Sequence, residues 1–299
     1  MPPFTYSGAR IPPELILMIL RHTLANPTSV PPSPADHQLR ASLLLLTRKI
    51  RETLIKDIYK TVILWDVCAI RGFANAFDAS PHLGSFIFNL WVGSTDMALV
   101  ENLDHQSVEG DCLRSIAHVL SGTPNLQRLY VSIDLMGSWT NFACPIPDTI
   151  QHLALPVNWV YRTAPWDHGS YATLKPVSFR MRGRPQGGEA LALKYFMSNP
   201  SRVVIELDRP DSDFSHVGVY LNELLNPDLQ ANGNRKCFID IVSPPPVLAR
   251  SRTALARFAE SRGPGFDMHR VRAVSQDLDD VSQLESWLRE GEHPFSGPF

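Results

Sequence analysis

The sequence has no excess of charge of either sign: 28 lysines and arginines stand against 30 aspartates and glutamates, a formal net charge of −2. A basic excess is typical of nucleic-acid-binding proteins, so nucleic acid is not expected as the main partner. Hydrophobic residues make up 44% and charged residues 19% of the 299 positions, as in an ordinary globular protein. This length allows one large domain or two smaller ones.

Cysteines and long apolar runs are also scarce. The four cysteines, at 68, 112, 144 and 237, include no pair at metal-ligand spacing and predict no disulfide framework in so long a chain. No apolar run reaches the roughly 18 residues of a membrane span. Residues 1–14 lack the features of a signal peptide, and every Asn-x-Ser/Thr triplet has proline at its centre. We therefore expect a cytoplasmic or nuclear protein with no membrane partner.

Motifs of enzyme active sites are missing. The sequence has no His-Glu-x-x-His, no Gly-x-Ser-x-Gly and no glycine-rich phosphate loop followed by Lys-Ser/Thr. The glycine-rich segment 183–190 is expected to be a turn, and the Asp-His-Ser neighbours in 166–170 lie too close in sequence for a catalytic triad. The ten histidines show no metal-ligand spacing. We expect no catalysis, no metal and no cofactor.

Two helices are predicted near the start of the chain. Residues 10–22 (RIPPELILMILRH) open with two prolines that suit a first helical turn, followed by six apolar residues from 15 to 20. Residues 38–59 form the second helix, because leucine and isoleucine recur there every three or four positions. The segment 26–37 holds four prolines and is predicted to be a loop, and 59–64 a short strand.

Beyond residue 65, short β-like runs alternate with amphipathic helices. The runs are 86–92, 126–133, 149–155, 177–182, 202–207, 237–242 and 269–274, and helices are expected at 112–122, 189–199, 217–226 and 247–262. Strands joined by helices predict a mainly parallel sheet. The loose repeat, with a Leu-x-x-Leu-x-Val unit in PNLQRLYV (124–131), favours an irregular α/β solenoid similar to leucine-rich repeats. A doubly wound open sheet is the alternative.

The segments IPPELILMIL (11–20) and LRASLLLLTRKIRETLIKDIYKTVIL (39–64) resemble an F-box. Together with FIFNLWVGS (86–94) and SGTPNLQRLYV (121–131), they make the chain similar to the divergent F-box-like family of fungi, whose C-terminal part resembles leucine-rich repeats. Two features depart from the family pattern. Ile50 stands where many F-boxes carry tryptophan, and the insert 26–37 separates helices that are usually joined tightly.

The resemblance implies that this helical module docks on the adaptor subunit of an SCF-type (cullin–RING) ubiquitin ligase. Carried over by position, the adaptor-binding residues are Ile11, Pro12, Leu15, Ile16, Ile19, Leu20, Leu43 and Ile50. There is also a physical reason to expect a partner surface here: a helix that is apolar on every side must be buried on every side. Each large aliphatic side chain left in water forfeits about 1.5–3 kcal/mol. The alternative is that the repeat domain covers this surface itself.

Side chains alternate along a strand, so the apolar phase of each run identifies the residues that point away from the core. These outward residues combine charges with aromatic rings, which are enriched at protein interfaces. We predict that they form a client-binding surface made of Trp91, Arg128, Tyr130, Arg180, Arg182, Glu206, Asp208, Lys236, Phe238, Asp240, Arg270 and Arg272.

The leading hypothesis is a non-catalytic substrate receptor. An F-box-like module at 10–65 binds the ligase adaptor, an α/β leucine-rich-repeat-like domain at 66–290 presents a client protein, and 291–299 is a tail. The first alternative is a non-catalytic scaffold in which the degenerate F-box is only a structural cap. The second is an α/β enzyme with an unrecognised site.

Overall fold

The computed structural model describes residues 15, 18, 20, 35, 38, 39, 42, 43, 45, 48–93, 105–131, 147–156, 178–182, 202–207, 217, 218, 221, 225, 238–262, 268–276, 282, 284, 287 and 288. The chain divides into two compact units, residues 1–61 and 62–299. Among the described residues, no helix is both long and apolar enough to cross a lipid bilayer.

The first unit is helical where it is described. Residues 15, 18 and 20 lie in helical backbone, as predicted for 10–22. The second predicted helix is interrupted, because Leu45 lies in a turn where its amide donates to the Ser42 carbonyl at 3.1 Å. Helix α3 (Arg48–Lys60) begins after this turn. The prediction of one continuous helix over 38–59 is therefore wrong: a run of leucines supports helical periodicity but carries no signal for the turn.

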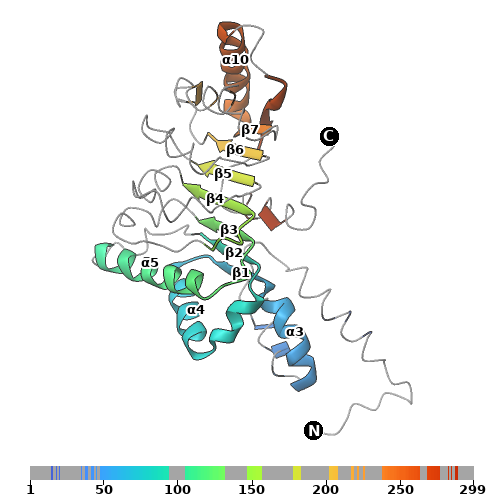
Figure 1. Cartoon of the computed structure of the whole chain (residues 1–299), viewed down its shortest axis with the longest axis vertical. Helices are drawn as coiled ribbons and strands as arrows, with labels where there is room; N and C mark the ends of the chain where they lie inside the picture. The colour runs from blue at the N-terminus through green and yellow to red at the C-terminus, as the bar shows by residue number, and fades with distance from the viewer. Residues whose placement is uncertain are drawn as a thin grey trace. The chain divides into compact units, whose positions relative to one another are not determined.

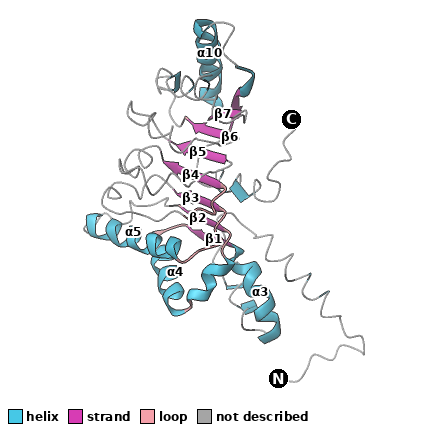
Figure 2. Ribbon diagram, viewed as in Figure 1, coloured by secondary structure: helices cyan, strands magenta, loops and turns pink. Residues whose placement is uncertain are grey.

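The second unit is built on a sheet whose strands follow the order of the chain (Figures 1 and 2). The described strands are β1 (Thr61–Leu64), β2 (Asn89–Val92), β3 (Arg128–Val131), β4 (His152–Pro156), β5 (Ser178–Arg182), β6 (Arg202–Glu206), β7 (Phe238–Ser243) and β8 (Val271–Ser275). All neighbours from β2 to β8 pair in parallel. The α/β class with a parallel sheet is thus confirmed. The described strands show no reversal of order, which a doubly wound sheet requires at its switch point.

The register sorts the strand residues into two faces. One of them, the aliphatic face, carries rows of side chains that are buried where they are described: Leu90, Leu129, Leu153, Val203 and Ile239 in one row, and Val92, Val131, Ile205 and Ile241 in the next. Burying a side chain of this size stabilises the fold by about 1.5–3 kcal/mol. These rows form the described core of the sheet.

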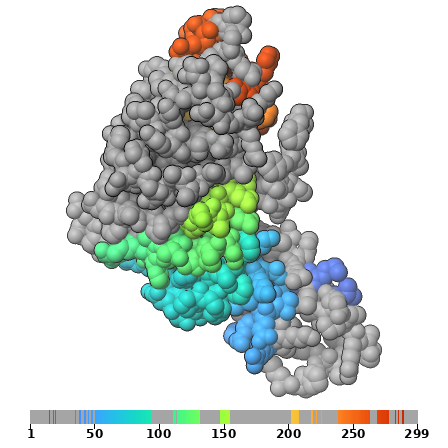
Figure 3. All heavy atoms as spheres, in the orientation of Figure 1, coloured from blue at the N-terminus to red at the C-terminus, as the bar shows by residue number. Residues whose placement is uncertain are grey.

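Helices pack beside both ends of the strand series. Helix α4 (Val67–Ala79) contacts α5 (His105–Ser121), and the two lie side by side at the surface in Figure 3. Helix α10 (Pro245–Arg262) packs on β7 and β8, where the Ser251 hydroxyl meets the Ser243 hydroxyl at 3.4 Å. Helices α5 and α10 confirm the predictions at 112–122 and 247–262, whereas α4 was not predicted.

Close packing next to α4 depends on two glycines. A Cβ added at Gly84, in the 3₁₀ helix η1 (Pro81–Phe86), would lie 2.0 Å from the Gly122 carbonyl oxygen. A Cβ added at Gly122 would lie 2.6 Å from the ring of Phe77. A side chain at either position would therefore force its neighbours to shift, and the Phe77 ring packs closely against these two glycines.

Candidate interaction surface on the sheet

Opposite the aliphatic face, the sheet presents a second face of mixed chemistry, here named the polar face. By register it carries Asn89, Trp91, Arg128, Tyr130, His152, Ala154, Arg180, Arg182, Arg202, Val204, Glu206, Phe238, Asp240, Val242, Arg272 and Val274. Alternation along each strand places these residues together although they come from seven strands. The polar face holds a buried valine cluster, Val204 and Val242 with Val274, and two clusters with polar groups that differ in chemistry and in how far they are covered.

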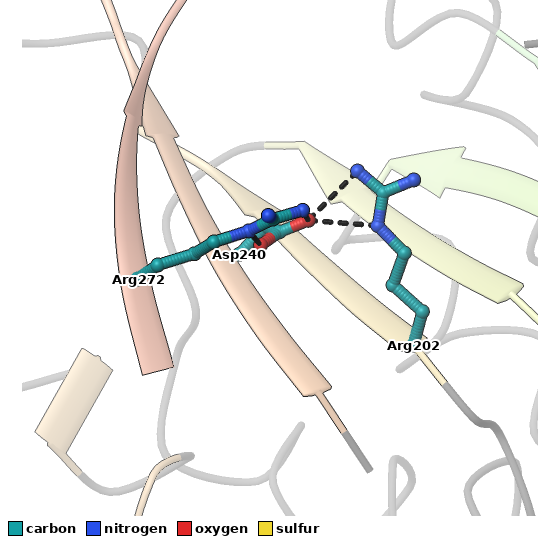
Figure 4. Close-up of polar contacts among 3 residues, drawn as sticks. All are labelled: Arg202, Asp240 and Arg272. Atoms are coloured by element: carbon teal, nitrogen blue, oxygen red, sulfur yellow. Dashed lines mark hydrogen bonds and ion pairs between the residues drawn. The ribbon is translucent and has the colours of Figure 1, made fainter. Parts of the chain in front are cut away.

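The first cluster is an arginine–aspartate–arginine group on β6, β7 and β8 (Figure 4). Asp240 is buried, with 1% of its side chain exposed, while 38% of Arg202 and 63% of Arg272 remain exposed. Arg202 donates from Nε to Oδ2 of Asp240 at 2.7 Å, and its Nη2 forms an ion pair with the same oxygen at 2.7 Å. Arg272 donates from Nε to Oδ1, and from Nη2 to Oδ2 at 3.1 Å. The two guanidinium groups are thus fixed by one carboxylate.

Two arginines and one aspartate make up this group, and their charges shift the pKa values of Asp240 and Arg272. Burial alone would raise the pKa of Asp240, but hydrogen bonds and positive charge from Arg272 and Arg202 outweigh it, so the pKa of the carboxyl is lowered. The same hydrogen bond and charge from Asp240 raise the pKa of Arg272. With two cations on one anion, the cluster presents net positive charge to solvent. Phe238 is the register neighbour of Arg202 and is exposed, which adds an apolar contact beside the charge.

The second cluster is aromatic and lies on β2 and β3. The rings of Trp91 and Tyr130 stack, with centroids 3.5 Å apart and planes 3° from parallel. Trp287, from the C-terminal part of the chain, meets Trp91 edge to face, with centroids 5.5 Å apart at 66°. The guanidinium of Arg128 lies 4.4 Å above the Trp287 ring, and its Nη2 donates to the Trp287 carbonyl. Residues far apart in sequence therefore close over this part of the polar face.

The face assignments made from alternation are confirmed for Trp91, Arg128, Tyr130, Glu206, Phe238, Asp240 and Arg272, but the expectation that the whole set is exposed is wrong. Trp91, Arg128 and Tyr130 are buried: Trp287 packs on Trp91 and Arg128, and the Trp91 ring stacks on Tyr130. Asp240 is buried between its two arginines. Alternation tells which face a residue is on and not what covers that face.

Two further residues of the predicted client surface are also buried. Glu206 lies on the polar face without exposure, and Arg270 belongs to the 3₁₀ helix η5 (Met268–Arg270), where strand alternation does not apply. Phe238 and Arg272 are exposed as predicted. Arg180 and Arg182 sit on β5, but their side chains lie outside the described part of the chain, as do Asp208 and Lys236.

The predicted adaptor-binding residues also differ in how exposed they are. Leu15 is exposed, Leu20 is half-buried and Leu43 is buried. Ile50 lies in α3, with its side chain outside the described part of the structure, and Ile11, Pro12, Ile16 and Ile19 also lie outside it. Leu43 is therefore already buried in the free chain.

Sequence reasoning missed two members of these clusters, Arg202 and Trp287. Arg202 was on a predicted strand and in the outward phase, so the same alternation rule could have included it. Trp287 has no comparable local signal, because its contacts with Trp91 and Arg128 join distant parts of the chain.

The described residues do not assemble a metal site: nowhere among them do three histidine, cysteine, aspartate or glutamate side chains come together. Comparison of the chain with protein-family models, with curated proteins and with solved structures finds no match. The function is therefore argued from the chain's own surfaces.

Proposed function

We propose that this protein is a non-catalytic substrate-receptor subunit of an SCF-type ubiquitin ligase. Its F-box-like N-terminal module docks on the ligase adaptor, and its leucine-rich-repeat-like domain holds a client on the polar face of the sheet. The receptor raises the effective concentration of the client near the catalytic subunits of the ligase. This role places it in the cytoplasm or the nucleus.

The observation that carries the proposal is the distribution of exposed apolar side chains. Of the five large hydrophobic residues exposed in the described parts of the chain, four belong to the first unit: Leu15, Met18, Leu39 and Leu45. Leu45 is 85% exposed and Leu15 46% exposed. A unit of 61 residues that leaves four such side chains in water gives up burial energy that a partner surface recovers.

Backbone hydrogen bonds at successive strand entrances support a repeat architecture for the second unit. The Phe88 carbonyl accepts from the amides of Gln127 and Arg128 at 2.8 and 3.0 Å. One strand further on, the Gln127 carbonyl accepts from Gln151 and His152 at the same two distances. The same local geometry thus recurs as the chain enters β3 and β4. Recurrent entry geometry and sequential parallel strands are features of solenoids with strand-lined binding surfaces.

One observation favours the scaffold alternative, in which the module is only a cap. Leu43 belongs to the apolar set expected to face the adaptor, yet it is buried. The two functions therefore differ on whether the exposed residues Leu15 and Leu45 contact a partner.

The experiment measures binding of the full chain to the purified SCF adaptor by calorimetry. The test variant is Leu15→Asp with Leu45→Asp, and the matched control is Phe238→Asp, since Phe238 is as exposed as Leu15 but lies in the second unit. We expect the test variant to weaken binding by about 10- to 150-fold per leucine in contact, with its melting temperature unchanged. Phe238→Asp should bind as the unchanged chain does. Absence of binding by the unchanged chain would overturn the receptor proposal in favour of the scaffold.

A further inference from the structure

The aromatic cluster shows what kind of ligand its surface accepts, because part of the chain already occupies it. The surface consists of Trp91, Tyr130 and Arg128, here named the aromatic patch. It contacts Trp287 through an indole edge, a guanidinium group over the ring and a hydrogen bond to the main-chain carbonyl of the same residue. The patch thus contacts both the aromatic ring and the backbone carbonyl of a single residue, as peptide-binding sites do.

The segment on the patch also defines a pattern. Residues 282, 284, 287 and 288 have helical backbone, and Leu284 and Trp287 are both buried, Trp287 with 3% exposure. Residues three apart lie on the same side of a helix. The chain thus offers a buried leucine and a buried tryptophan three positions apart, a Leu-x-x-Trp pattern whose tryptophan lies on the patch.

One polar group of the patch has no partner among the described residues. The indole Nε1 of Trp91 is fully buried and has no hydrogen-bond partner among the described residues. It faces Gly93, where an added Cβ would lie 2.6 Å from Nε1. An unpaired buried donor is costly, so a ligand that brings an acceptor to this nitrogen gains over the chain's own segment.

The chain between β8 and Trp287 is long enough to span the distance from β8 to the aromatic patch on β3, so its length allows Trp287 to leave the patch and return to it. Five strand spacings of about 4.8 Å separate β3 from β8, or about 24 Å. Twelve peptide units lie between Ser275, the last residue of β8, and Trp287, and an extended chain of that length reaches up to about 40 Å. The chain is therefore long enough to reach the patch, although the helical backbone at residues 282, 284 and 287 makes its reach shorter than that of an extended chain.

We propose that the aromatic patch is a client-binding subsite for a helical peptide with a Leu-x-x-Trp pattern, and that the chain's own Trp287 occupies it when no client is bound. This proposal deepens the receptor function and rests on it. A client that presents the pattern displaces the chain's own Trp287 and pairs with Arg128 in its place.

The test uses the full chain and a fluorescently labelled peptide of residues 280–291, DVSQLESWLREG. A tethered segment competes at an effective concentration in the millimolar range, so Trp287→Ala should bind the peptide about 10²-fold more tightly than the unchanged chain. Trp287→Phe, which keeps a smaller ring, should show an intermediate gain. The control peptide carries alanine at its tryptophan, and Arg128→Leu is added to Trp287→Ala as the control protein. Each control should lose about tenfold or more in affinity.

Thermal melting shows whether each Trp287 variant is folded, so that a failure to bind peptide can be told from a failure to fold. If Trp287→Ala melts as a folded protein yet binds no more peptide than the unchanged chain, the proposal is overturned. If Trp287→Ala does not fold and Trp287→Phe gains no binding, Trp287 is a permanent part of the core and the proposal is equally overturned. A gain in either folded variant supports it. Adaptor binding, measured on the same preparations, reports separately on the receptor function, because it depends on the first unit.

Discussion

Removing both arginines that flank Asp240 should cost more stability than the sum of the two single changes. In either single variant, Arg202→Ala or Arg272→Ala, the buried carboxylate keeps one guanidinium partner. In the double variant it keeps neither of the described cations, although its side chain is only 1% exposed. The free-energy cost is then that of a buried charge and not of a lost surface contact.

The expected magnitudes follow from the burial of each partner. Each arginine is at least a third exposed and can be rehydrated, so each single variant should lose about 1–2 kcal/mol, the worth of hydrogen bonds to a charged group reduced for exposure. An uncompensated buried charge costs about 3–5 kcal/mol. The double variant should therefore exceed the sum of the singles by about 1 kcal/mol.

The assay is urea unfolding of the full chain at pH 7 and again at pH values below 4. In the unchanged protein the pKa of Asp240 is lowered, so its contribution is fully present above the unfolded-state pKa of about 3.9 and is lost as pH falls through the folded-state value. In the double variant only burial remains, which raises the pKa of Asp240. Its penalty is then present at pH 7 and disappears on acidification, so the two stability curves should converge below about pH 4.

A matched control exists elsewhere in the second unit. Asp111 is also flanked by two arginines, Arg71 at 3.4 Å and Arg114, but 48% of its side chain is exposed. The variant Arg71→Ala with Arg114→Ala should cost no more than about 1 kcal/mol and be additive. Equal costs for the two double variants, or additivity at Asp240, would refute the explanation that the arginines compensate a buried charge.

Replacing Gly122 by alanine should destabilise the second unit by about 1–3 kcal/mol, because the added Cβ would lie 2.6 Å from the Phe77 ring. Gly72→Ala, in α4 with no atom within 4 Å of the added Cβ, should instead stabilise by about 0.5–1 kcal/mol. Thermal melts of the two variants in the opposite order would contradict this packing. Asp66→Ala should cost about 1 kcal/mol, since the Asp66 side chain caps α4 by accepting from the Ala69 amide at 2.6 Å. Urea unfolding measures this loss, and an unchanged midpoint would show that the cap contributes nothing.

The strands could be predicted from the sequence because their signal is local. The run 177–182 contains β5 (Ser178–Arg182), and 202–207 contains β6 (Arg202–Glu206). Period-two alternation then sorts residues onto the correct face, as it did for Asp240 and Phe238. Helix α4 could also have been predicted, since Ile70, Ala74 and Phe77 follow helical spacing after the capping Asp66.

Coverage of the polar face could not be predicted, because it depends on contacts between distant parts of the chain. Arg128 and Trp287 are 159 residues apart, and no local pattern relates them. The pairing of Arg202 with Asp240 likewise requires knowing that β6 and β7 are neighbours in register. An arginine on a strand looks the same in sequence whether its guanidinium is solvated or lies over a tryptophan.

The Arg128–Trp287 contact has a consequence for how the second unit comes apart. In a sheet where each described strand bonds only to the strands before and after it, the last strand can fray and the others can follow one at a time. Here Trp287, which follows β8 in the chain, is bound by Arg128 on β3. This contact acts as a non-covalent crosslink, and β4–β8 lie between the two residues that it joins. Peeling from β8 then requires that Trp287 be released first. A ligand that displaces Trp287 would therefore also remove this restraint from the end of the sheet. Binding at β2 and β3 would then lower the local stability of β8.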